Sequence, residues 1–86
     1  MSRAFAAEIR AERTAQRLTQ VELAKRARLG ESTVKRIEGE ARSADTTQLW
    51  KLCRALGITV TELAMRAERR LSAEQRQPRR QQASGG

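Results

Sequence analysis

The chain has 86 residues, enough for one small domain, and its 18 Lys and Arg against 10 Asp and Glu leave a formal net charge of +8. This excess favours an anionic partner, although basic surfaces also occur on proteins that bind no nucleic acid. With no histidine, a single cysteine and no glycine-rich phosphate loop, the usual zinc and nucleophile–base sites cannot be assembled. We predict that the chain is not an enzyme and needs no metal or cofactor.

Composition also limits which kind of nucleic acid the chain could bind and in which cellular compartment it is expected. One Phe, one Trp and no Tyr leave too few rings for base stacking, so an anionic partner is better sought in double-stranded than in single-stranded nucleic acid. No apolar run is long enough to span a bilayer, the N-terminus lacks a signal peptide, and one cysteine cannot form an internal disulfide. We therefore expect a cytoplasmic protein with no membrane partner.

The first predicted helix covers about residues 3–17. Phe5 and Ile9 are four residues apart and share its inward face. Arg13 lies on or near the same face, where a cation requires a partner.

Residues 19–38 are predicted to form two short helices joined by a turn. Thr19 with Glu22 three residues later has the spacing of a capping box, which satisfies free backbone N–H groups at a helix start. In the second helix Val34 and Ile37 face inward. The outward positions are then Ser32 and Arg36, flanked by Glu31, Lys35 and Thr33. A short helix with such an outer face suits the major groove of DNA.

Two further helices follow a loop at residues 39–44. Asp45 with Gln48, and Thr59 with Glu62, again have capping-box spacing, and Gly57 ends the first of these helices. Cys53 lies on the inward stripe of that helix, and we interpret it as a core residue.

Two side chains in this half are candidate dimer contacts. Trp50 lies beside the apolar stripe, and it either covers the core or contacts a second subunit, since Trp is enriched at interfaces. Met65, with Leu71, lies off the main stripe of the last helix, as an apolar patch for a twofold partner or as part of a frayed helix end.

The end of the chain differs in composition from the rest. From Ser72 onward the residues leave no apolar face, and half of the net charge of +8 lies in residues 69–86. We therefore predict a domain at residues 1–70 and a basic, disordered tail at residues 71–86.

Five short motifs occur in the order and spacing of a known family. They are Ile9-Arg10-x-x-Arg13, Leu18-Thr19-Gln20-x-Glu22-Leu23-Ala24, Ser32-Thr33-Val34-x-Arg36-Ile37-Glu38, Leu49-x-x-Leu52-Cys53-Arg54-Ala55-Leu56-Gly57-Ile58 and Thr59-x-x-Glu62-Leu63. The chain resembles the Cro/CI-type (lambda-repressor-like, XRE-like) helix-turn-helix family over this stretch. The resemblance implies an all-α fold, a compact five-helix domain with the helix-turn-helix at helices 2 and 3, and double-stranded DNA as partner.

For the base-reading helix, Arg36 is the first candidate because a guanidinium can bind guanine O6 and N7 together. Ser32, Thr33 and Lys35 are further candidates. Glu31 could accept from cytosine, but Glu31 and Lys35 are also spaced to pair with each other. Both interpretations are open.

The resemblance also implies roles outside that helix. Gln20 would contact a phosphate and support helix 3, the alternative being a solvated glutamine at a helix start. Thr19, Arg28 and Arg42 are the other predicted phosphate contacts. In similar proteins the arginine that corresponds to Arg13 pairs with the glutamate that corresponds to Glu38. The alternative is that Arg13 lies on the surface.

Three departures from the family lie in turns. Arg28 stands where the family usually has a glycine, often with positive φ, and Gly30 stands where Ser or Thr caps helix 3. In the next loop, the glycine of the family comes one position after Gly39.

We predict a bacterial or phage transcriptional regulator of the repressor type, which is cytoplasmic and associated with the bacterial nucleoid. It would bind an inverted-repeat operator as a homodimer. Half-sites would lie about 34 Å apart, one helical turn. A protein antagonist is a further possible partner. The alternatives are a protein-interaction module, such as an antitoxin or an antirepressor-bound regulator, and a nonspecific nucleoid binder.

Overall fold

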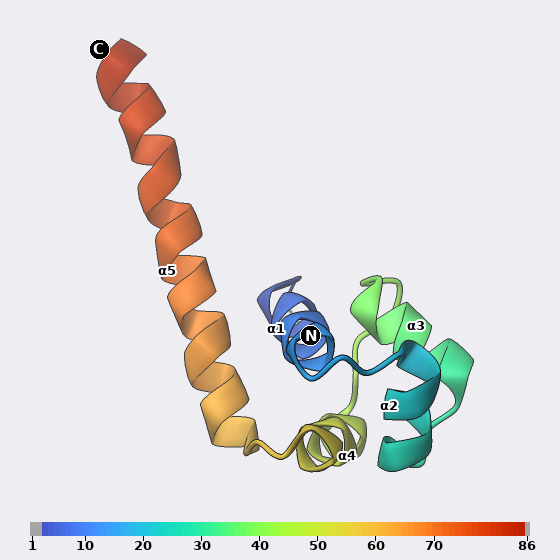
Figure 1. Cartoon of the computed structure of the whole chain (residues 1–86). Coiled ribbons are helices and arrows are strands. Elements are labelled where there is room, and N and C mark those ends of the chain that lie inside the picture. The colour runs from blue at the N-terminus through green and yellow to red at the C-terminus, as the bar shows by residue number, and fades with distance from the viewer. Residues whose placement is uncertain (1–2, 86) are drawn as a thin grey trace.

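The computed structural model describes the backbone of residues 3–85 and the side chains of residues 3–75. This part of the chain is all helical, and the predicted five-helix, all-α architecture is confirmed (Figure 1). The helices are α1 (Arg3–Ala15), α2 (Gln20–Ala27), α3 (Glu31–Glu38), α4 (Thr46–Leu56) and α5 (Val60–Gly85).

Capping boxes start two of the helices. At α2 the Glu22 N–H donates to the Thr19 hydroxyl at 3.0 Å, and the Thr19 N–H donates to the Glu22 carboxylate at 2.8 Å. Asp45 and Gln48 make the same reciprocal pair at α4.

Of the two hydrogen bonds in the capping box predicted at α5, only one forms. The Glu62 N–H donates to the Thr59 hydroxyl at 3.0 Å. The Glu62 carboxylate accepts from Arg66 at 2.6 Å, because a cation one turn further along the helix is a stronger partner than a neutral backbone N–H.

Among residues 3–85, three residues other than glycine adopt the left-handed conformation, all of them in turns. They are Arg17 (φ 59°), Arg28 (φ 57°) and Glu40 (φ 65°). Arg28 and Glu40 are the positions where the family has glycine, so each residue carries a backbone cost of about 1 kcal/mol that glycine would avoid. Gly30 is the N-cap of α3 and provides no side-chain hydrogen bond.

The core receives one large aliphatic side chain from every helix. Ile9, Leu23, Ile37, Leu52 and Leu63 are all fully buried. Each comes from a periodic inward face, and α3 contacts both α1 and α2 around this core. Cys53 belongs to the same cluster, and burial raises the pKa of its thiol to about 11, which keeps it protonated at neutral pH.

The helix α5 packs along α1 and then extends past the rest of the molecule (Figure 1). The sequence predicts a disordered tail at residues 71–86, whereas the backbone is helical to Gly85. Residues 72–77 are Ser, Ala, Glu, Gln and Arg, which mostly favour helix, so no local signal stops α5 where its apolar face ends. A domain boundary at residue 70 stays a prediction.

Two further features are absent from the described residues. No helix among them is both long and apolar enough to cross a membrane. They also hold no cluster of three Cys, Asp or Glu side chains that could bind a metal ion.

Candidate nucleic-acid interface

The C-terminal end of α3 is anchored through a buried carboxylate. Glu38 is 2% exposed, and its side chain accepts from Arg13 Nε at 2.8 Å and from Gln20 Nε2 at 3.0 Å. The ion pair expected between Arg13 and Glu38 is therefore present, and Arg13 is not a surface residue. Because the two donors come from α1 and α2, Glu38 joins three helices at one point.

Arg10 contributes to the same anchor. Its Nη1 donates to the backbone carbonyl of Glu38 at 2.8 Å, and Arg13 Nη1 donates to the carbonyl of Leu18 at 2.8 Å. The signal for this role is the spacing of Arg10 and Arg13, which puts both guanidiniums on one face of α1.

The rest of α3 presents a polar outer face. Val34 and Ile37 are fully buried, so the residues between them in the helical repeat face outward. The exposed side chains are Glu31, Ser32, Lys35 and Arg36, and Thr33 is half-buried. The five predicted base-reading residues thus come together on one helix.

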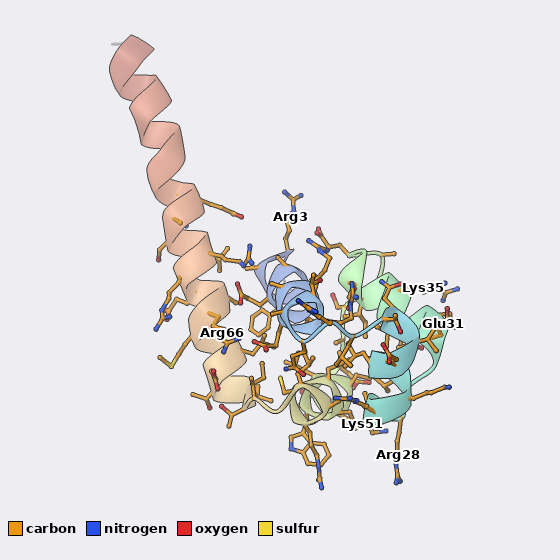
Figure 2. All side chains as sticks on the ribbon, viewed as in Figure 1. Arg3, Arg28, Glu31, Lys35, Lys51 and Arg66 are labelled. Carbon is orange, nitrogen blue, oxygen red and sulfur yellow. The ribbon has the colours of Figure 1, made fainter. Side chains whose placement is uncertain are left out.

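Two of these five are engaged with each other. Lys35 Nζ lies 2.9 Å from the Glu31 carboxylate, as the i, i+4 spacing allows (Figure 2). Arg36 makes no ion pair within residues 3–75. Its guanidinium is therefore the uncompensated positive charge on the outer face of α3.

The N-terminus of α2 offers hydrogen-bond donors beside α3. Gln20 is the first residue of α2, so its backbone N–H has no partner inside the helix. One side-chain N–H of Gln20 already binds Glu38, which shows that this residue does support α3. The Thr19 hydroxyl oxygen accepts from Glu22, and its hydrogen stays available to an outside acceptor.

Arg42 lies in the loop after α3 and is exposed. The loop is attached to α3, because the backbone N–H groups of Ala41 and Arg42 both donate to the carbonyl of Arg36, at 2.9 and 3.3 Å. Arg42 is thus held at a fixed end of α3.

Arg28 does not join the other predicted phosphate contacts. It lies in the turn after α2 and lines a groove between α2 and α4 together with Lys51. In Figure 2 its side chain points away from Glu31 and Lys35. Its backbone is left-handed, with φ 57°, and the sequence alone did not reveal which side of the molecule its side chain takes.

The two candidate dimer residues are also separated. Trp50 is 51% exposed on α4, with the Arg54 guanidinium 5.2 Å from its ring centroid. Met65 is 50% exposed on α5 and lines a different groove with Phe5 and Leu71. Because Trp50 and Met65 line different grooves, their positions do not indicate a single flat interface that contains both.

The sequence model of the helix-turn-helix family matches residues 9–63, which contain the anchored α3 and its outer face. The chain belongs to the Cro/CI-type helix-turn-helix family. It is a DNA-binding transcription regulator, and since such regulators are non-enzymatic, the prediction that the chain is not an enzyme is confirmed.

Solved structures extend the likeness beyond the matched segment. A crystal structure of the clp gene regulator ClgR from Corynebacterium glutamicum has a TM-score of 0.84 at 22% sequence identity, covering 93% of this chain and 85% of that one. A second crystal structure of that regulator has a TM-score of 0.70 at 26% identity, covering 76% and 84%. A search of the curated proteins finds no match. The likeness at 22% identity shows that the fold is shared over nearly the whole chain.

Proposed function

We propose that this regulator is a repressor that reads an inverted-repeat operator as a homodimer, with one α3 in the major groove of each half-site. The observation that carries the proposal is the exposed, unpaired Arg36 on a helix whose end is anchored through Glu38. A guanidinium on a rigid helix can bind guanine O6 and N7 in one geometry, and this discriminates between bases.

Phosphate contacts would orient α3 in the groove. Thr19 and Gln20 present donors at the N-terminus of α2, where the helix dipole also favours an anion. Arg42 approaches from the loop that follows α3, which is attached to the carbonyl of Arg36. Donors on two separate elements beside α3 would fix its register on the duplex.

A dimer would contact through α5. Met65 and Leu71 are 50% and 41% exposed and line one groove with Phe5. The proposal requires that a twofold partner on this apolar surface bring two α3 helices to one face of DNA, at half-sites about 34 Å apart. An operator that overlaps a promoter would give repression, because polymerase and regulator then compete for the same DNA.

The test is selection of bound fragments from random and source-genome DNA at about 150 mM salt, where nonspecific phosphate binding is weakened. We expect an enriched inverted repeat. Arg36→Ala should lower the affinity for it about tenfold or more and relax the preference at one position of each half-site.

The control is Arg69→Ala, which removes an exposed cation of α5 and should leave the sequence preference unchanged. If folded protein enriches no sequence, the proposed operator reading is wrong. An equal loss of affinity on all sequences in Arg36→Ala would instead identify a nonspecific DNA binder.

A further inference from the structure

The surface between α2 and α4 is a basic groove, and no residue of α3 lines it. It has a volume of about 610 Å³. Arg26 and Arg28 lie on the α2 side and Lys51 and Arg54 on the α4 side, and no acidic residue lines it. Among the described residues none of these four cations forms an ion pair, whereas Arg3, Arg13, Lys35, Arg66 and Arg70 all do.

Helix electrostatics account for only half of this cluster. Arg26 and Arg54 lie in the last turns of α2 and α4, where a cation is favoured by the helix dipole. Arg28 lies beyond the end of α2, and Lys51 lies in the middle of α4. Four like charges around one groove repel each other, and an anionic ligand would relieve that repulsion.

The groove also offers an apolar contact. Ala27 and Ala55 form part of its lining, and Trp50, 51% exposed, presents its ring beside the cations. Trp and Arg are the residues most enriched where protein interfaces are strongest. A complementary ligand would therefore carry both carboxylates and an apolar side chain.

The position of the groove argues against duplex DNA as this ligand. Arg28 points to a different side of the molecule from Glu31 and Lys35 on α3 (Figure 2). A duplex seated on the outer face of α3 would leave the groove open. We propose that the groove binds an acidic peptide segment of a partner protein, with its carboxylates on the four cations and an apolar residue against Trp50. This interaction is independent of operator reading.

The single tryptophan of the chain makes the groove directly observable. The probe is a short synthetic peptide of alternating Glu and Leu pairs with blocked ends, added to the full-length protein while Trp50 fluorescence is recorded. We expect a saturable change in emission. The matched peptide with Gln in place of every Glu should produce none, because it retains the apolar contacts and loses the charges.

Variants of equal charge change locate the binding site. Lys51→Glu should weaken binding of the Glu/Leu peptide about tenfold or more, since it removes one attractive charge and adds a repulsive one. Arg69→Glu, on the exposed surface of α5, should leave the affinity within about twofold. Arg26→Glu, at an exposed position, serves as the second groove variant if Lys51→Glu does not fold.

Three results would overturn the proposal. They are an absence of any Trp50 response to the acidic peptide, an equal loss of binding in Arg69→Glu, and a response to operator-free duplex DNA that depends on Lys51. The last result would make the groove a phosphate-binding surface. Each is distinguishable from failure of the operator proposal, because DNA selection depends on Arg36 and should be unchanged in Lys51→Glu.

Discussion

Glu38 shows how one residue can position a whole helix, α3. Its carboxylate is buried, and a buried charge is tolerated only when it is paired and fully hydrogen-bonded. Arg13 and Gln20 meet that requirement, and no buried side-chain nitrogen or oxygen within the described residues lacks a partner. The direction of α3 is therefore set by hydrogen bonds as well as by packing.

Removing one partner of this pair should cost far more than removing both. Arg13→Met leaves the Glu38 charge buried, and we expect the free energy of unfolding to fall by about 3–5 kcal/mol. The double variant Arg13→Met, Glu38→Leu should recover much of that loss, because no charge is left in the core. Urea unfolding monitored by circular dichroism measures both. A loss below about 1 kcal/mol in the single variant would show that water reaches Glu38.

At the scale of helices, α1 and α5 are joined by complementary charges. Arg66 pairs with Glu12, and Arg70 pairs with Glu8, so the two helices run antiparallel with matching i, i+4 spacings. Gln16 donates to Glu12 at 3.0 Å and to the carbonyl of Leu56 at 2.7 Å. Hydrogen bonds from Gln16 and then Arg66 hold the pKa of Glu12 below its ordinary value.

This contact should weaken in acid. Because the pKa of Glu12 is lower in the folded than in the unfolded chain, its contribution is present at neutral pH and is lost as the pH falls below 4.5 through the folded value. Glu12→Gln should lower the free energy of unfolding by about 1 kcal/mol at pH 7, and the difference from wild type should narrow in acid.

The matched control for this prediction is Glu74→Gln, since Glu74 is exposed and forms no ion pair among the described side chains. Its effect should be close to zero at every pH. Denaturant unfolding at several pH values gives the curves, and a Glu12→Gln difference that does not change with pH would contradict the assignment.

At the scale of the whole molecule, the length of α5 gives the protein its shape. The principal extents are 51 × 24 × 23 Å, and α5 lies along the side of α1 before it projects (Figure 1). Its exposed apolar side chains, Met65 and Leu71, line a groove with Phe5 of α1, and no residue of α3 lines that groove. A partner on this surface would leave α3 accessible.

If the dimer forms through α5, Met65→Glu should raise its dissociation constant about tenfold or more, because the new carboxylate must be desolvated in an apolar contact. Sedimentation equilibrium measures this directly. Val21→Glu is the control, since Val21 is a 40% exposed apolar residue on α2. Equal effects of the two variants, or a wild-type chain that stays monomeric on operator DNA, would exclude this surface.

By itself, the sequence determined the local structure and the family. Capping boxes at Thr19 and Asp45 and the apolar periodicity of each helix depend on residues at most four apart, so they can be read along the chain. The same periodicity placed Arg36 on the outer face of α3. The Arg13–Glu38 pair followed only from the family resemblance, because residues 25 positions apart have no local signal.

Only the tertiary structure decided which distant charges meet. The spacing of Glu8 with Glu12, and of Arg66 with Arg70, is visible in the sequence, but pairing them requires the antiparallel contact of α1 and α5. The basic groove that Arg28 lines with Lys51 depends on how α2 packs against α4. These features arise from helix packing, which sums weak contacts over the whole core and leaves no mark on any short stretch of sequence.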